Sequence, residues 1–148
     1  MKPFGKNQFL FLGCFTGLIL LGGCEKAEPE VCGLLEIRNS IVKMIANDDN
    51  NPLVNYAAKN SNAVAAMVGE TKVEAEKLRI LENAKRNAVY TLNDTILTKL
   101  RDRVTHSVTC IGFLDVKVAD ATAQKEVEFK VKQSTDGKML VSVNPFLF

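Results

Sequence analysis

The chain has 148 residues, of which 47% are hydrophobic and 24% are charged, a balance typical of a globular domain rather than a disordered chain. The 19 basic and 17 acidic residues nearly cancel, to a formal net charge of +2 at pH 7. A chain this close to neutrality gives no electrostatic reason to expect nucleic acid or an anionic membrane surface as a partner, because both select a clustered positive field.

The first 24 residues have the pattern of an export signal that ends in a cysteine. Lys2 and Lys6 precede an apolar stretch of thirteen residues, Phe9–Leu21, and Gly22–Cys24 follows it. A basic segment, an apolar segment and small residues in this order are typical of a secretory signal peptide. The apolar stretch is shorter than the roughly 20 residues with which a helix crosses a bilayer, so the pattern favours a cleaved signal over a permanent span.

The ending Leu21-Gly22-Gly23-Cys24 resembles the lipobox of bacterial lipoproteins. This resemblance implies that residues 1–23 are removed and that Cys24, carrying fatty acyl groups such as palmitate, becomes the first residue of the mature protein. Each buried methylene contributes about 0.8 kcal/mol to membrane binding, so two or three acyl chains would form a durable anchor where one would hold only marginally. An ordinary signal peptide with an incidental cysteine is the alternative.

The residue after this cysteine bears on the location of the protein. Glu25 follows Cys24, whereas an aspartate at that position is the residue that resembles an inner-membrane retention signal. We therefore expect a lipid anchor in the outer membrane and a protein that faces the periplasm. The inner membrane and the cell surface are the alternatives.

Removal of residues 1–23 leaves a nearly neutral chain of the size of one domain. Lys2 and Lys6 leave with the signal and no acidic residue does, so 125 residues remain with 17 basic and 17 acidic side chains. That length suits a single compact core. Residues 24–31 are charged, contain Pro29 and lack apolar periodicity, so we predict a tether there and one domain over residues 32–148.

The four cysteines predict one disulfide. Cys14 would leave with the signal and Cys24 would carry lipid, which leaves Cys32 and Cys110 in an exported chain. An oxidising periplasm favours joining them, and a bridge across 77 intervening residues would contribute about 4 kcal/mol in the chain-entropy model. A redox-active or metal-binding pair is the alternative, but such pairs generally require the closer Cys-x-x-Cys spacing.

The region up to residue 88 has the periodicity of helices. Apolar residues at helical spacing predict a first helix over Cys32–Ala46, and Asn51-Pro52 then caps and begins a second helical segment with a break near Asn60–Asn62. Gly69 ends that segment. Thr71–Glu74 matches a capping box, and Leu78, Leu81, Ala84 and Ala88 would form the buried side of the helix that follows.

From residue 89 the pattern changes to that of strands. Residues 89–103 suit a strand interrupted near Asn93-Asp94, although a helix continuing to Arg103 is an alternative. Val108–Val118 and Glu126–Lys132 alternate as half-buried strands, Ser134–Gly137 predicts a hairpin turn, and residues 138–143 return as a strand until Pro145 ends pairing.

These elements predict an α+β domain. We expect N-terminal helices packed on a C-terminal antiparallel meander of three to four strands, with one disulfide. Cys110 shares the parity of Val108 and Leu114, which predicts that it meets Cys32 and joins the first helix to the sheet.

The sequence contains no motif for catalysis, a cofactor or a metal. His106 is the only histidine, and a general base also needs a partner within hydrogen-bond reach. No nucleophile elbow, dinucleotide-binding turn, phosphate-binding loop or zinc-binding helix motif is present. We therefore expect no catalytic residue, no cofactor and no metal site.

The last residues of the sequence are aromatic. Asn144–Phe148 either folds back over the core, which we favour, or presents Phe146 and Phe148 to another protein. The second alternative would make these two side chains a partner contact.

A second resemblance concerns the strands. Thr109–Val116, Glu126–Val131 and Thr135–Val141 look like the C-terminal half of small bacterial lipoproteins that pair an early cysteine with a strand cysteine and have no assigned activity. The resemblance supports fold and location only.

Together these observations favour a non-enzymatic lipoprotein of the cell envelope that binds a protein partner or serves in envelope or secretion assembly. The first alternative is an inhibitor or immunity lipoprotein that blocks a hydrolase or toxin with a loop such as Asp120–Lys125 or Ser134–Lys138. The second alternative is a small hydrolase in which His106 meets a carboxylate in a pocket.

Overall fold

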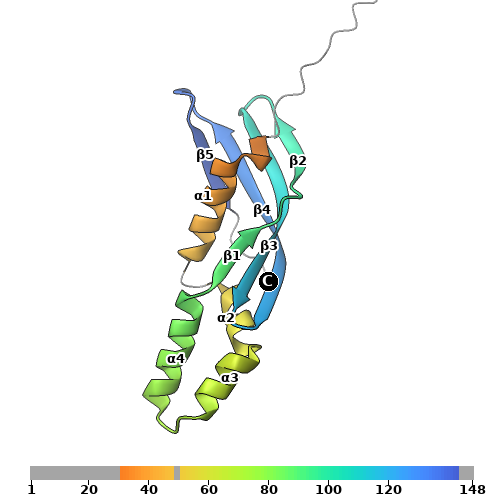
Figure 1. The fold of residues 1–148 in the computed structure, drawn as a ribbon. Helices are drawn as coiled ribbons and strands as arrows, with labels where there is room; N and C mark the ends of the chain where they lie inside the picture. The colour runs from red at the N-terminus through yellow and green to blue at the C-terminus, as the bar shows by residue number, and fades with distance from the viewer. Residues whose placement is uncertain (1–30, 49–50, 144–148) are drawn as a thin grey trace, which may run out of the picture.

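The structure is a computed structural model that describes residues 31–48 and 51–143. Helices come first along the chain and an antiparallel, curled sheet follows, as Figure 1 shows. The helical elements are η1 (Val31–Gly33, a 3₁₀ turn), α1 (Leu35–Ala46), α2 (Pro52–Lys59), α3 (Asn62–Gly69) and α4 (Glu74–Arg86). The strands are β1 (Val89–Leu92), β2 (Leu97–Asp102), β3 (Ser107–Val118), β4 (Ala121–Gln133) and β5 (Met139–Val143). The predicted α+β class is confirmed.

Helix α1 buries one stripe of isoleucines. Ile37, Ile41 and Ile45 are buried at a spacing of four residues, which keeps them on one side of the helix. The predicted helix is confirmed, except that its first residues form the separate 3₁₀ turn η1. Arg38 ties α1 to the sheet, because its guanidinium donates to the Leu92 carbonyl oxygen at 2.7 Å and lies 2.6 Å from the Asp94 carboxylate.

Side-chain caps produce the predicted break between α2 and α3. The Asn51 side chain accepts a hydrogen bond from the Leu53 backbone N–H at 2.9 Å, and Pro52 occupies the first turn. Ser61 does the same for α3, since its hydroxyl oxygen accepts from the Val64 N–H at 3.0 Å.

The predicted capping box of α4 is wrong. The helix begins at Glu74 after Val73, and the Thr71 hydroxyl oxygen instead accepts a bond from the Val73 N–H at 3.2 Å, in a local turn before the helix. The predicted buried side is also wrong at Leu78, which is 62% exposed, and no residue of α4 is buried. The physical reason is that the main packing partners of α4 are α2 and α3, with no sheet beneath it.

The long β3–β4 hairpin is the centre of the sheet. Strands β1 and β2 both pair with β3 along its other edge, β1 with Leu114–Lys117 and β2 with Ser107–Ile111. The interrupted strand predicted over residues 89–103 is confirmed and the helical alternative is wrong. The sheet therefore has one strand more than the predicted three to four.

Strand β5 pairs with β4 over Phe129–Gln133. The turn before β5 is closed by a bond from the Gly137 N–H to the Ser134 carbonyl oxygen, and Gly137 has a positive φ of 83°, a conformation that glycine adopts without strain. The predicted hairpin is confirmed. The other turn of β4 is shorter than expected, because β4 already begins at Ala121, so most of residues 120–125 is strand and not loop.

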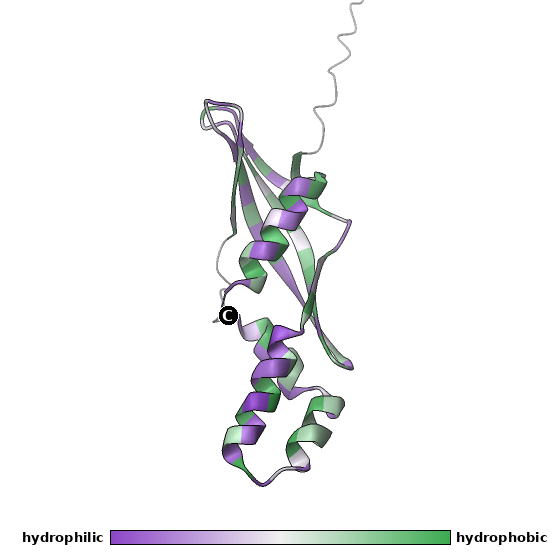
Figure 2. Cartoon of the chain, turned by 60° about the vertical axis from the view of Figure 1, so that its left-hand side comes forward, coloured by the Kyte–Doolittle hydropathy of each residue, from purple (hydrophilic) through white to green (hydrophobic). Residues whose placement is uncertain are grey.

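The core lies between the helices and one face of the sheet. Even-numbered residues of β3 and odd-numbered residues of β4 point into it, with Leu114 and Phe129 among the largest buried side chains. Helix α1 crosses this face beside β1 and β5, and α2 covers the far end of the hairpin. Figure 2 shows α3 and α4 extending beyond the end of the sheet.

Candidate functional site

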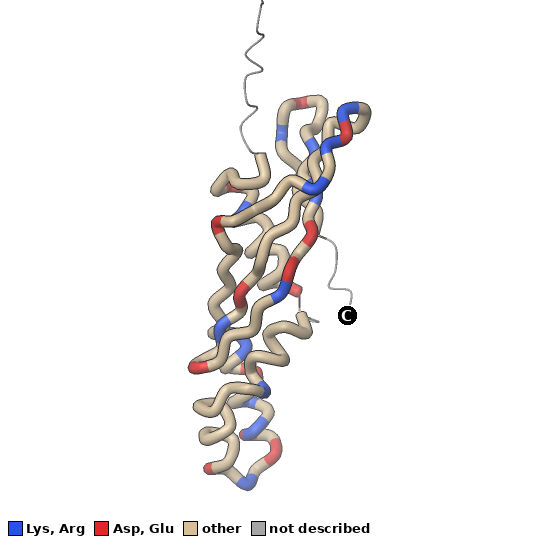
Figure 3. The backbone as a smooth tube through the Cα atoms, turned by 90° about the vertical axis from the view of Figure 1, so that its right-hand side faces the viewer, with Lys and Arg blue, Asp and Glu red and all other residues tan. Residues whose placement is uncertain are grey.

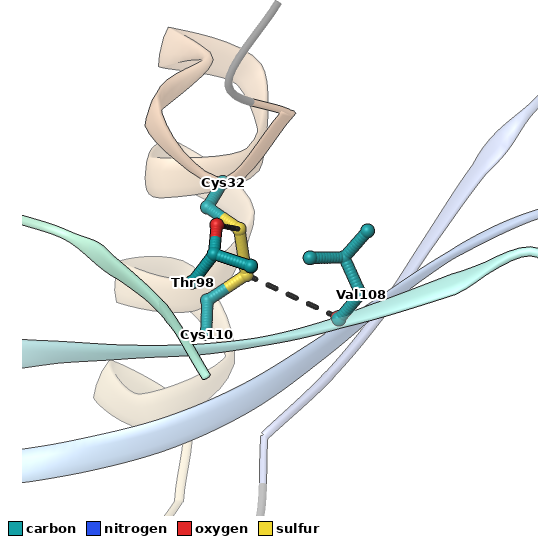
Figure 4. The surroundings of a disulfide bond; sticks show 4 residues. All are labelled: Cys32, Thr98, Val108 and Cys110. Atoms are coloured by element: carbon teal, nitrogen blue, oxygen red, sulfur yellow. Dashed lines mark hydrogen bonds between the residues drawn. A yellow bond between two sulfur atoms is a disulfide. The ribbon is translucent and has the colours of Figure 1, made fainter. Parts of the chain in front are cut away.

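The disulfide joins η1, at the start of the described residues, to strand β3. Cys32 and Cys110 are joined with their Cα atoms 6.2 Å apart, and both residues are buried. Figure 4 shows the bridge between η1 and β3, with the Thr98 hydroxyl oxygen 3.7 Å from the Cys32 sulfur and the Val108 carbonyl oxygen 3.9 Å from the Cys110 sulfur. The predicted disulfide is confirmed, and it joins the start of the helical region to the central strand.

The other predicted site residues lie outside the described residues. Cys24, expected to carry lipid, and Phe146 and Phe148, weighed as a partner contact, all fall in the ranges 1–30 and 144–148. Their roles stay predictions.

An open groove lies between α2 and the first half of β4. Its volume is about 920 Å³, and its lining is mostly apolar. The lining residues are Pro52, Leu53, Asn55, Tyr56 and Lys59 of α2 and Thr122, Ala123, Gln124 and Lys125 of β4. Tyr56 is 61% exposed beside this groove. The sequence pattern alone did not indicate that this residue lines a groove.

Helix α3 is uncharged and largely exposed. Its eight residues include no Lys, Arg, Asp or Glu, and Val64 is its only buried residue. Met67 is 45% exposed, and Ala63, Ala65 and Ala66 are exposed as well. Figure 3 shows the contrast at this end of the molecule, where α3 is free of charge and α4 carries both signs.

A single carboxylate fixes the start of α3. Asp120, in the β3–β4 turn, accepts a hydrogen bond from the Ser61 hydroxyl at 2.5 Å and another from the Ala63 N–H at 3.1 Å. The hydrogen bond from Ser61, followed by that from Ala63, holds the pKa of the Asp120 carboxyl below its usual value. The turn thereby positions α3 relative to the sheet.

The face of the sheet away from the helices carries apolar side chains among charged ones. Leu97 of β2 pairs with Ile111 of β3, and Phe113 pairs with Glu126 of β4. Leu97 is 64% and Phe113 43% exposed. An ion pair between Lys99 and Glu128 crosses the same face.

His106 lies in the exposed turn between β2 and β3. It has a positive φ of 48°, and its carbonyl oxygen accepts a bond from the Gln133 N–H at 3.1 Å. The nearby Asp102 carboxylate accepts from the Val104 and Thr105 N–H groups, and hydrogen bonds from Thr105 lower its pKa. The carboxylate closest in sequence to the histidine therefore holds the turn.

Residues 31–48 and 51–143 hold neither a candidate metal cluster nor a candidate membrane span. No group of three or more His, Cys, Asp or Glu side chains there is placed to hold a metal ion. No helix in these ranges is both long and apolar enough to span a bilayer.

Comparison with known proteins gave no match, whether with family models, with curated proteins or with solved structures. Among the described residues, the exposed, uncharged α3 and the groove beside α2 are candidate contact surfaces.

Proposed function

We propose that this protein is a non-enzymatic lipoprotein, anchored through Cys24 on the periplasmic side of the outer membrane, that acts as a binding or assembly module of the cell envelope. The lipobox-like ending at Cys24 supports the anchor. The Cys32–Cys110 disulfide supports an exported protein, because such bonds persist in oxidising compartments. His106, the one candidate base, lies on an exposed turn.

The exposure of α3 is the single observation that carries the binding role. A helix that is apolar around its circumference is normally buried, yet α3 buries only Val64 within the described chain. An exposed apolar surface of this kind is typical of a protein contact. We therefore propose that α3 docks onto an apolar surface of another envelope protein.

The position of α3 fits this role. Figure 1 places η1, where the described chain begins, at one end of the molecule and α3 at the other. A lipid anchor seven residues before Val31 would thus lie at the end opposite the binding helix.

Site-specific photo-crosslinking in cells tests the contact. A photoreactive residue in place of Met67 on α3 should give one discrete crosslinked product. The matched control is the same residue in place of Arg79 on α4, whose side chain is 73% exposed and should give none. Adding Ala66→Glu to the Met67 probe should remove the product, because it places a charge within the apolar contact, while the exposed position leaves the fold intact.

Identical products from Met67 and Arg79, or a Met67 product that survives Ala66→Glu, would contradict the binding role of α3. The identity of the crosslinked protein then distinguishes an assembly module from an inhibitor or immunity lipoprotein. An assembly or secretion component supports the proposal. A hydrolase or toxin captured by a probe at Thr135, in the exposed Ser134–Lys138 turn, supports an inhibitor or immunity lipoprotein.

Intact-mass analysis of the protein purified from membranes tests the anchor. The expected mass is that of residues 24–148 plus acyl groups. A chain that still begins at Met1, or a shortened one without added hydrocarbon, would refute the lipoprotein assignment while leaving the α3 contact open.

A further inference from the structure

One edge of β4 extends beyond its pairing with β5. Strand β5 reaches only to Phe129, opposite Val143, whereas β4 begins eight residues earlier at Ala121. Among the described strands, only β3 pairs with Gln124 and Glu126. Figure 1 shows β5 beside one half of β4 only, with α2 near the other half.

Two backbone hydrogen bonds define the direction of the N–H and C=O groups along β4. The Gln133 N–H donates to the His106 carbonyl oxygen, so odd-numbered residues of β4 bond toward β3. The Ser134 N–H donates to the Lys138 carbonyl oxygen, so even-numbered residues bond toward β5. Because this direction alternates along an antiparallel strand, the N–H and C=O groups of Gln124 and Glu126 point to the edge beyond β5. Such an edge is a template for another strand.

The residues that follow β5 can supply that strand. Continuing the β4–β5 register places Phe146 opposite Glu126 and Phe148 opposite Gln124. Five residues span about 17 Å at about 3.3 Å each, enough to reach this part of β4. Pro145 falls opposite Val127, where the alternation points the N–H of the new strand away from β4, so its missing donor costs no ladder bond.

The same register places an apolar side chain at the groove. Leu147 takes the parity of Val141 and Val143, which face the core and are half-buried. Its partner position on β4 is Lys125, which lines the groove together with Leu53 and Tyr56 of α2. A leucine at this point removes apolar surface of both the groove and the side chain from water.

We propose that residues 144–148 extend β5 along β4 and fill the groove between α2 and β4 with Leu147. Phe146 and Phe148 then stand on the opposite face of the sheet, in the row of Leu140 and Ser142. Phe146 would lie one strand beyond Glu126, the partner of Phe113, so this face gains two aromatic side chains, with Glu126 between Phe146 and Phe113. This inference does not depend on the proposed function.

Backbone amide hydrogen exchange on the full mature chain in detergent tests the docking. We expect slow exchange at Gln124 and Glu126, and a large acceleration at both when residues 144–148 are deleted. The neighbouring amides of Lys125 and Val127 are internal controls, because their N–H groups point to β3 and should exchange at unchanged rates.

Two point variants separate docking from a general loss of order. Phe146→Pro removes an N–H that would donate to β4 and should accelerate Gln124 and Glu126 as the deletion does. Pro145→Ala restores an N–H that points away from β4, so protection should remain. Both positions follow the last described strand, and unchanged slow exchange at Lys125 and Val127 would confirm that the β3–β4 hairpin is retained.

Three results would overturn the inference. Fast exchange at Gln124 and Glu126 in the full chain would show that no strand covers the edge. Slow exchange that survives the deletion would show that α2 alone protects it. Protection that disappears on dilution would show that a second copy of the chain supplies the strand.

Discussion

At the residue scale, Asp120 belongs to the β3–β4 turn and also binds the start of helix α3. It ends the β3 side of the central hairpin, after Ala119 with its positive φ of 51°, and its carboxylate binds the start of α3 through Ser61 and Ala63. Position along the sequence did not indicate this role, because Asp120 lies 57 positions after Ala63. The side chain is therefore a tertiary link between sheet and helix.

The first prediction concerns the acid sensitivity of this link. The pKa of Asp120 is lower in the folded chain than the usual value of about 3.9 expected after unfolding. A lowered folded pKa stabilises the fold fully above the unfolded value, and this contribution is lost as the pH falls through the folded pKa. Asp120→Asn should modestly reduce stability near pH 7, and the difference from the wild type should shrink below about pH 4. Urea unfolding at a series of pH values measures both effects.

A local measurement gives the control for this prediction. The amides of Ala63 and Val64 should exchange several-fold faster in Asp120→Asn, because the neutral amide oxygen of asparagine is a weaker acceptor than the carboxylate for the Ala63 N–H and for the Ser61 hydroxyl that caps Val64. Asp115→Asn changes a carboxylate within the hairpin, where Asp115 accepts from the Gln124 side chain at 2.8 Å, and should leave these amides unchanged. An equal response to both substitutions would contradict a specific role for Asp120.

At the element scale, the strands were predictable because the hairpin buries one face. Val116 and Val118 of β3 point to the core, while Lys117 between them is exposed, so the alternation in the sequence carries the register. Helix α1 was predictable for the same reason, because its buried residues Ile37, Ile41 and Ile45 form one stripe. Where an element buries one face against one neighbour, the spacing of apolar residues in its sequence matches the residues that the structure buries.

The buried faces of the helices without such a neighbour could not be predicted. Leu78 of α4 and Ala65 of α3 have the spacing of buried residues, yet both are exposed because no sheet lies under these helices. The groove beside α2 could not be predicted either, since Tyr56 and Gln124 meet there only through the packing of helix on strand. Apolar spacing indicates which face can be buried and does not indicate what covers it.

The second prediction concerns the link between helical region and sheet. Replacing Cys32 and Cys110 with alanine should lower the free energy of unfolding by about 4 kcal/mol, because the bridge closes a loop across 78 positions of the unfolded chain. Chemical denaturation of the oxidised wild type and the double variant measures the difference. The Met67 crosslink should persist under conditions where the variant is folded, since α3 lies far from the bridge along the chain.

Thiol alkylation supplies the control for the disulfide. Unfolded mature protein that has not been reduced should take up no alkyl group at either cysteine, and reduction should expose two sites. Two labelled thiols without reduction would rule out the bridge in the purified protein and would remove the basis of the stability prediction.

At the scale of the whole molecule, the fold has two unlike ends. One end holds η1 together with the β2–β3 and β4–β5 turns, and the other holds the connection between α3 and α4 (Figure 1). Residues 25–30 can span at most about 20 Å, so an anchor at Cys24 would keep the η1 end near the lipid surface. The proposed binding helix would then face away from the membrane.

The last prediction tests this orientation with the lipidated protein in vesicles that contain a headgroup-bound quencher. A fluorescent residue at Thr135, in the β4–β5 turn, should be quenched more strongly than one at Lys72, between α3 and α4, because quenching falls steeply with distance from the surface. Both positions are exposed, so the label should disturb the fold at neither. Equal quenching would mean that the long axis lies along the membrane, and stronger quenching at Lys72 would place α3 against lipid. In that case the apolar helix would be a membrane contact, and the proposed protein partner would be wrong.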